Sequence, residues 1–228
     1  MIIGEKKYGF SKGLAFYSEL ESQRFSKELE EGWLLDKISM LGYYRFQKVQ
    51  KEEAQIIIDF YPGKKIDKKE YLDLYEAAGW QELLSYRQRY FVFKASSLEA
   101  PEIYSDEESF NTRLMKEIRW FFLNVFEFFI LSGLGLYVLN ITAIKEFVQK
   151  IPFIYEVLYF IGLMGLLFPL SGAVAFLYFR IIYKKRSLYY KTPNKYANKQ
   201  RFIRDMLWLM LLGALIGGVI GFCYGFFI

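Results

Sequence analysis

Residues 206–228 read MLWLMLLGALIGGVIGFCYGFFI, an apolar run without a single charge. A helix needs about 20 apolar residues to cross the hydrocarbon core of a bilayer, so this run is long enough. Two further runs, at residues 120–141 and 153–179, are also long and apolar, with one acidic residue in each. A buried core helix is the alternative for any one run, but a chain of this length cannot bury three. We therefore expect a bundle of three transmembrane helices.

The charged residues are concentrated in the other half of the chain. Hydrophobic residues make up 54% and charged residues 24% of the 228 positions, and residues 1–117 carry charges throughout. Both fractions are high for one uniform globule, so the two classes must be segregated. We expect a soluble domain over residues 1–100, a linker and the start of a juxtamembrane helix over 101–118, and a membrane domain over 119–228.

The loops between the apolar runs predict the orientation. The second loop carries nine Lys and Arg residues against one Asp, whereas the first carries only Lys145 and Lys150 with Glu146. Basic loops stay in the cytoplasm. The charged N-terminal segment shows no secretory signal. We expect a multi-pass protein of the cell membrane with its N-terminus in the cytoplasm and its C-terminus outside.

The basic loop also predicts a lipid contact. Its cations and interleaved tyrosines would suit single-stranded nucleic acid, but topology and the anionic inner leaflet explain them without one. We expect no nucleic-acid partner. The residues expected to contact anionic lipid are Lys184, Lys185, Arg186, Lys191, Arg201 and Arg204.

Two features of the apolar runs predict contacts between helices. Asn124 and Glu127 lie one turn apart within the first run. An ionisable residue at that depth is costly, so Glu127 either serves a function inside the bundle or, protonated, joins helices through a hydrogen bond. In the third run a glycine recurs every fourth residue and forms one face for close helix packing, against this chain, a second copy or another protein. These glycines are Gly213, Gly217, Gly221 and Gly225.

Two stretches of the N-terminal half read alike. Ser18–Glu21 and Asp67–Glu70 have the spacing of a capping box at the start of a helix, and Gly32 and Gly79 follow as stop signals. A tryptophan and strand-like residues come directly after each glycine. We expect an α+β domain with both helices on one face of an antiparallel sheet, ferredoxin-like or related, and a further strand over residues 8–17.

The chain lacks the residues for much of enzyme chemistry. It has no histidine, and its single cysteine is Cys223 in the third apolar run. Nucleophile–histidine pairs and imidazole zinc ligands are therefore excluded. The carboxylates of the soluble half, Asp59 among them, form no spaced set distinct from a solvated helix face. We expect no catalytic, cofactor-binding or metal-binding residues, no cofactor, and a protein that is not an enzyme.

Four segments resemble a known family. Residues 30–46 (EEGWLLDKISMLGYYRF), 71–80 (YLDLYEAAGW), 90–94 (YFVFK) and 102–109 (EIYSDEES) are similar to the bacterial family called domain of unknown function 2812. The resemblance covers about residues 10–115. It implies C-terminal membrane spans and a gene often next to a PadR-type regulator, but no activity and no catalytic residues. The chain departs from the family pattern at Leu41-Gly42-Tyr43, where the family often has a second Gly-Trp.

These observations favour a non-enzymatic membrane protein with a cytoplasmic protein-interaction domain. Its role would be regulatory or accessory, in membrane stress, peptide-antibiotic self-protection or transport, with a protein partner or a second copy. The alternative is a subunit of an oligomeric small transporter or channel that uses Glu127. A third hypothesis, an enzyme acting on lipid or peptidoglycan precursors, is disfavoured by the very short outer loop and the missing catalytic set.

Cysteine labelling tests the orientation. In a Cys223→Ala chain, a cysteine replacing Val148 should react with an impermeant maleimide on intact cells, because the first loop is expected outside. A cysteine replacing Lys195 should react only after the membrane is permeabilised. Labelling of position 195 from outside would contradict the expected orientation.

Overall fold

The computed structural model describes residues 1–40, 42–95, 103–151 and 153–227. The chain divides into two compact units. Unit 1 contains Met1–Glu107 together with Arg186–Ile228, and unit 2 contains Glu108–Lys185. The C-terminal segment thus belongs to the same unit as the N-terminal domain, and the expected membrane domain over residues 119–228 stays a prediction.

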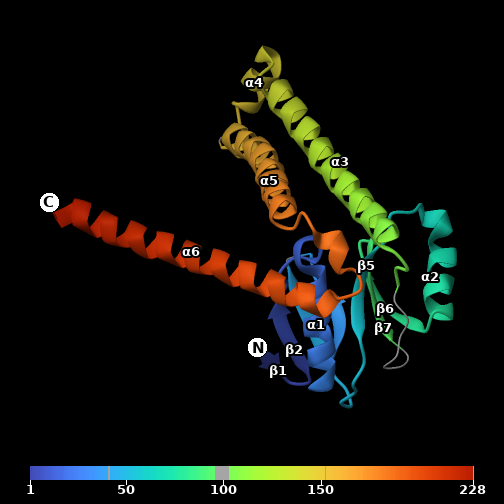
Figure 1. Ribbon diagram of the computed structural model, residues 1–228. Helices are drawn as coiled ribbons and strands as arrows, with labels where there is room; N and C mark the ends of the chain where they lie inside the picture. The colour runs from blue at the N-terminus through green and yellow to red at the C-terminus, as the bar shows by residue number, and fades with distance from the viewer. Residues whose placement is uncertain (41, 96–102, 152, 228) are drawn as a thin grey trace. The chain divides into compact units, whose positions relative to one another are not determined.

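The N-terminal domain begins with one antiparallel sheet and a helix (Figure 1). Helix α1 (Leu14–Glu30) connects the second strand to the third. The sheet has the order β1-β2-β4-β3, so β4 lies between β2 and β3, which are parallel to each other. This arrangement is a split β-α-β unit. Its strands are β1 (Ile2–Ile3), β2 (Lys6–Phe10), β3 (Trp33–Ile38) and β4 (Tyr43–Lys48).

The second half of the domain repeats this topology. A short 3-10 helix, η1 (Lys65–Asp67), leads into helix α2 (Lys68–Ala77). The sheet order β5-β7-β6 matches β2-β4-β3 strand for strand. The strands are β5 (Ile56–Phe60), β6 (Trp80–Tyr86) and β7 (Tyr90–Ala95). The similarity of the two stretches therefore corresponds to a structural repeat, but its halves form two sheets where we expected one, and a ferredoxin-like fold is not confirmed.

Helix α1 closes the outer edge of β5. Ile56 and Ile58 donate their backbone N–H groups to Ser26 Oγ at 2.8 Å and Ser22 Oγ at 3.0 Å. The other edge of β5 pairs with β7. Four helical residues rise about 6 Å and two strand residues about 6.6 Å, so serines one turn apart match alternate strand residues. Two hydroxyl groups thus take the place of a neighbouring strand and protect an exposed edge.

The observed helix boundaries agree with some of the predicted start and stop positions and differ from others. Gly32 and Gly79 have φ values of 88° and 82°, the left-handed conformation that ends a helix. Asp67 immediately precedes α2 as expected. The first helix, however, begins at Leu14, and residues 8–17 are not one strand, because Gly13 has a φ of 103° and breaks the extended chain. The backbone of α1 is non-helical at Tyr17, so Ser18 begins the helical segment that follows this kink, four residues after the start of α1.

Unit 2 contains three helices, α3 (Glu107–Leu139), α4 (Thr142–Val148) and α5 (Ile154–Ile182), of which the first begins at the boundary residue. Within the described residues, α3 and α5 are long and apolar enough to cross a membrane. The most apolar 18-residue window is 0% buried in α3 and 11% buried in α5. The core helix of a soluble protein would be mostly buried, so this exposure suits a lipid environment better.

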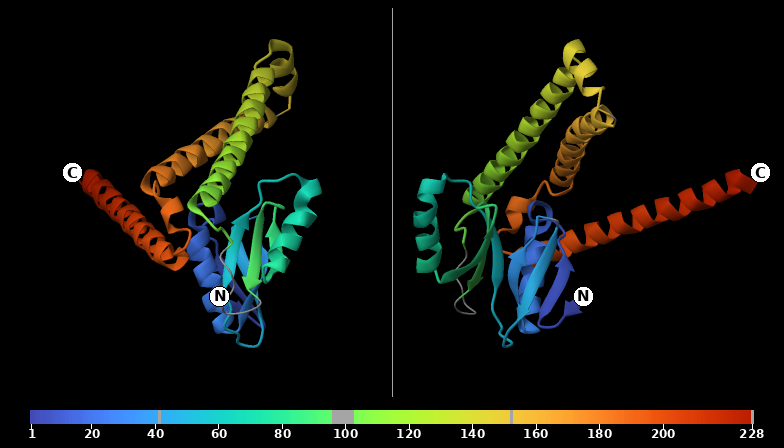
Figure 2. Two further views of the ribbon diagram at one scale, coloured as in Figure 1. Left: turned by 45° about the vertical axis from the view of Figure 1, so that its right-hand side comes forward. Right: turned by 180° about the vertical axis from the view of Figure 1, so that it is seen from behind.

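The C-terminal segment of unit 1 contains a short 3-10 helix, η2 (Arg186–Tyr189), and a 35-residue helix, α6 (Pro193–Phe227). Figures 1 and 2 show α6 as one continuous rod that begins beside α1. We expected a loop up to residue 204 and a span from 206, but a single helix runs through both. Pro193 suits the first helical position, where its missing N–H has no intrahelical acceptor. Ile228 lies outside the described residues, and the bundle of three helices stays a prediction.

Removing the two serine hydroxyls tests the edge contact. The Ser22→Ala, Ser26→Ala double variant leaves the N–H groups of Ile56 and Ile58 unpaired, at a cost of about 1–3 kcal/mol each. We expect a lower unfolding temperature of the full chain in detergent and faster amide exchange at both isoleucines. Lys27→Ala, at an exposed position of the same helix, is the control. Unchanged exchange at Ile56 and Ile58 would show that the serines do not protect this edge.

Candidate functional site at the contact between helices α1 and α6

Helix α1 contains a kink that is bridged by a residue 180 positions further along the chain. Tyr17 has a non-helical backbone conformation, with φ −130° and ψ 35°. Next to it, Phe16 C=O accepts a hydrogen bond from Gln200 Nε2 at 3.2 Å, and Leu20 N–H donates one to Gln200 Oε1 at 2.9 Å. A regular helix would pair this carbonyl and this amide with each other. The amide of Gln200 therefore inserts into the hydrogen-bond ladder of α1, a recognised cause of helix kinks.

An ion pair lies beside this bridge. Arg186 Nε and Nη2 donate to the two carboxylate oxygens of Glu19 at 2.7 Å and 2.9 Å, and Nη2 also reaches Ser18 Oγ. Gln200 Nε2 donates to the same carboxylate at 2.8 Å. Both charged side chains are only 12% exposed. A two-pronged guanidinium–carboxylate pair sets orientation as well as distance, so it fixes η2 against α1.

The first three turns of α6 present one buried face to this contact. Tyr196, Gln200 and Ile203 are buried and follow each other at helical spacing. Arg201 donates to Gln23 Oε1 at 3.1 Å on the flank. We interpreted this segment as a basic loop, because its cations dominate the sequence. The signal that we missed is the spacing of these three residues, which is typical of a helix packed on one side.

The six cations expected to contact lipid have different local surroundings. Lys184, Lys185 and Lys191 are exposed. Arg186 is bound to Glu19, and its guanidinium is therefore already used inside unit 1. The remaining two, Arg201 and Arg204, lie on α6, where Arg204 also pairs with Asp205.

The polar residues of the first apolar run are not paired with each other. Asn124 Nδ2 donates to Trp120 C=O one turn earlier in α3, at 2.7 Å. Glu127 is exposed and has no hydrogen bond or ion pair with any described residue. A contact between Asn124 and Glu127 is thus absent from the described part of the chain.

Small residues allow a close helix approach on α5. A side chain added at Gly162 would collide with Leu136 of α3, and one added at Gly165 would collide with Ser132. Phe121 and Phe176 stack between the same helices, with ring centroids 4.4 Å apart. These glycines of α5 therefore serve a contact with α3 inside unit 2.

The glycine face of α6 is open where it is described. A Cβ atom added at Gly213 or Gly217 would meet nothing within 4 Å. The surroundings of Gly221 and Gly225 lie outside the described residues. The predicted packing role of this face therefore stays a prediction, and its partner is not among the described residues of unit 1.

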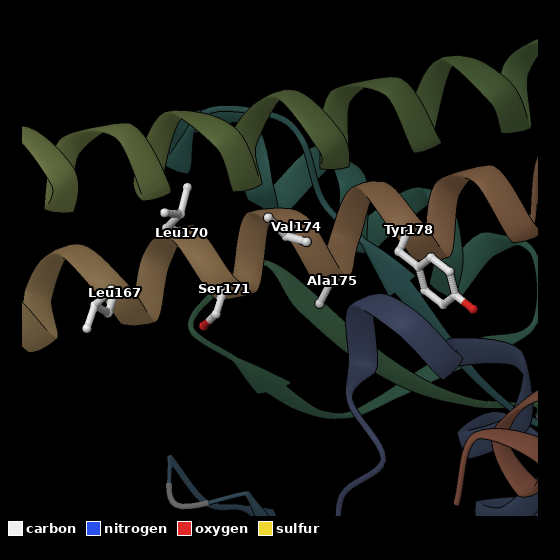
Figure 3. Close-up of a pocket in the computed structure, with 6 residues that line it drawn as sticks. All are labelled: Leu167, Leu170, Ser171, Val174, Ala175 and Tyr178. Carbon is white, nitrogen blue, oxygen red and sulfur yellow. The ribbon is translucent and has the colours of Figure 1, made fainter. Parts of the chain in front are cut away.

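Figure 3 shows a shallow apolar depression along α5. All of its lining residues come from this one helix. Of its two hydroxyl groups, that of Ser171 donates to Phe168 C=O at 2.8 Å, and the other belongs to Tyr178. Ligand sites combine an apolar wall with several converging polar groups. This depression has no such groups, so we do not assign a ligand to it. Its lining residues are Leu167, Leu170, Ser171, Val174, Ala175 and Tyr178.

A second polar cluster, also missed from the sequence, surrounds a buried carboxylate. Asp59 on β5 accepts hydrogen bonds from the hydroxyl groups of Tyr71 at 2.9 Å, Tyr75 at 2.7 Å and Tyr104 at 2.7 Å. Burial first, and then the charge of Asp59, raise the pKa of Tyr71 and of Tyr75, so both phenols stay neutral donors. Because Asp59 is satisfied by these donors, the cluster joins β5, α2 and the segment before α3. The sequence signal was the one-turn spacing of Tyr71 and Tyr75.

Neither cluster has the composition of a metal centre. Within the described residues, no group of three or more Asp, Glu, Cys or His side chains is placed to hold a metal ion. The α1–α6 contact consists of an amide, an ion pair and a hydroxyl that bind each other. What this arrangement does physically is to connect the position of α1 with that of α6.

Replacing Gln200 tests the bridge. Gln200→Leu keeps a similar volume but leaves Phe16 C=O and Leu20 N–H without the amide, at a cost of about 1–3 kcal/mol for each unpaired group. We expect a lower unfolding temperature and faster amide exchange at Leu20. Asn198→Leu, at an exposed position of the same helix, should change neither quantity. Equal behaviour of the two variants would show that the amide does not hold the kink.

Comparison with known proteins places most of the N-terminal domain in one family. Residues 18–126 match the family described as Protein of unknown function (DUF2812). No curated protein and no solved structure matches the chain. The matched region includes Glu19 and Asp59 but neither Arg186 nor Gln200, so the family match does not extend to the α6 side of the contact. The resemblance inferred from residues 10–115 is confirmed, and this chain carries a DUF2812 domain over residues 18–126.

Proposed function

We propose that this protein is a non-enzymatic membrane protein whose cytoplasmic DUF2812 domain binds another protein and passes that event to helix α6. One observation carries the proposal. Gln200, fully buried in the kink of α1, belongs to the same uninterrupted helix as the uncharged run that starts at Met206. A helix is stiff over this length, so a shift of α1 displaces the apolar half of α6. This coupling suits a regulatory or accessory role.

Three further observations support a membrane location. Helices α3 and α5 are long, apolar and largely unburied. Lys184, Lys185 and Lys191 are exposed and available to anionic lipid, each contributing about 1 kcal/mol near such a surface. The open glycine face around Gly213 and Gly217 suits a partner helix in the bilayer.

The kind of groups at the α1–α6 contact favours binding over catalysis. Its donors and acceptors are directed at each other, and the proposal adds a second state in which the two helices are separated. A partner that binds one state better than the other shifts the equilibrium between them. Membrane stress, peptide-antibiotic self-protection and transport are the processes in which such a switch would serve.

Isolation from native membranes tests the proposal. We expect the full chain, purified in mild detergent, to carry a second protein in a fixed ratio by native mass spectrometry. We expect Gln200→Leu, which loosens α6 from α1, to change the amount of bound partner at least several-fold, while Asn198→Leu leaves it unchanged. A chain that purifies only with copies of itself would contradict this function.

The second candidate function is an oligomeric channel or transporter subunit. It is favoured by Glu127, an exposed carboxyl on α3 with no polar partner among the described residues. A carboxyl in hydrocarbon needs a partner or water, and a ring of neighbouring copies supplies both.

Ion flux into vesicles that contain the purified chain separates the two functions. Under the main proposal, flux stays at the level of empty vesicles. Under the second, flux is present, falls at least tenfold in Glu127→Gln and is kept in Glu156→Gln, a matched change at another exposed carboxyl of an apolar helix.

A further inference from the structure

An exposed apolar tip lies at one end of the first sheet. Phe10 is the last residue of β2, and Met40 lies in the turn between β3 and β4. Ser11 N–H donates to Gly42 C=O at 2.9 Å, so the end of β2 and this turn are adjacent. The side chain of Phe10 is 83% exposed and that of Met40 is 76% exposed. Large apolar groups held so far into solvent at one place indicate an interaction site.

Cationic side chains lie near the same end of the sheet. Lys12 follows Phe10 by two residues, which limits their Cα atoms to about 7 Å apart. Burial is the main cause that lowers the pKa of Lys12, and the positive charges of Arg204, Arg24 and Arg201 lower it further, while Glu21 opposes them. Arg24 Nη1 also donates to Phe10 C=O at 2.7 Å, so one cation lies at the tip itself, and Gln200 of α6 donates to Phe16 C=O at 3.2 Å near the start of α1.

The contact between α6 and α1 lies near the tip, because α1 begins four residues after Phe10. Gln200 is bonded to Phe16 and Leu20, and Arg204, one turn later, acts on Lys12, nearer the start of α1. Helix α6 thus packs against the first turns of α1, six residues before Met206, where its uncharged part begins. The exposed apolar tip, the cations and the start of the apolar helix meet in one region of unit 1.

We propose that the tip formed by Phe10 and Met40 inserts into the surface of an anionic bilayer beside α6, with Lys12 and Arg201 at the level of the headgroups. This inference rests on the proposed membrane location of α6. Aromatic and aliphatic side chains next to basic residues are the composition by which peripheral segments bind anionic membranes. The insertion would fix the DUF2812 domain to the bilayer at a second point besides α6.

Charge favours lipid over a second copy of the chain as the occupant. A two-fold contact through the tips would bring the same cations toward each other, at a cost in energy. Anionic headgroups instead neutralise these cations, and the attraction falls with added salt. The apolar tip next to a cationic ring therefore fits a membrane surface.

A fluorescent probe at the tip tests the proposal in the full chain. In the Cys223→Ala background, the Met40→Cys change provides a cysteine to which an NBD label is attached in place of the methionine side chain. In vesicles of phosphatidylcholine and phosphatidylglycerol, lipid with a nitroxide close to the headgroup should quench this label several-fold more than a label on Leu74→Cys. Leu74 is a matched control, because it is also apolar and 65% exposed but lies on α2. Phe10→Asp should reduce the inserted fraction at position 40 roughly tenfold, and high salt should reduce it as well.

A third label separates failure of this inference from failure of the membrane proposal. A label on Ile220→Cys, in the apolar part of α6, should be quenched by lipid with a nitroxide deep in the acyl chain. Quenching at 220 with none at 40 would overturn the tip insertion alone, whereas no quenching at 220 would overturn the membrane location of α6. A label at 40 that is shielded from water but not quenched by lipid would show that a second copy covers the tip, and would also overturn the inference.

Discussion

The arrangement of unit 1 depends on an amide inserted into a helix. At the kink of α1, Gln200 supplies an acceptor to Leu20 N–H and a donor to Phe16 C=O. Buried backbone groups that lack a partner cost a large part of a small domain's stability, so the kink is tolerated only while Gln200 is in place. The kinked geometry of α1 and the attachment of α6 therefore depend on the same hydrogen bonds of Gln200.

Helix α1 is central because its sides serve three different neighbours. Ser22 and Ser26 close the edge of β5, Phe25 packs edge-on against Tyr44 with ring centroids 4.9 Å apart, and Glu19 holds Arg186. The two halves of the repeat form separate sheets, and α1 is the element that contacts both of them as well as α6. A change in the position of α1 would disturb its contacts with β5 and with α6 at the same time. This is the physical basis for the proposal that the domain reports its state to the C-terminal helix.

The small residues of the apolar helices have different surroundings. Gly162 and Gly165 of α5 are covered by side chains of α3, so their lack of a side chain is used within the chain. Gly213 and Gly217 of α6 meet nothing in the described residues, although their spacing is the more regular. Regular spacing indicates a face suited to packing, but whether a face is occupied depends on which helices come together.

The sequence by itself determined those features that rest on local chemistry. The helix stops at Gly32 and Gly79 follow from the left-handed backbone that glycine adopts freely, and the apolar runs at 120–141 and 153–179 follow from length and hydropathy. The repeat in the soluble half likewise follows from the order of its local sequence signals: a helix start, a glycine stop, a tryptophan and strand-like residues. The DUF2812 domain was identified from the same segments, because motif residues keep their spacing along the chain.

Only the tertiary structure decided the contacts between distant residues. Nothing next to Gln200 in the sequence marks it as the partner of Phe16 and Leu20, and Asp59 looked like any other carboxylate until Tyr71, Tyr75 and Tyr104 surrounded it. The same holds for the outer edge of β5, where serines of a helix took the hydrogen bonds that a strand would have made. Each of these outcomes depends on which buried polar groups find partners across the fold, and that pairing is set by packing in three dimensions rather than by local propensity.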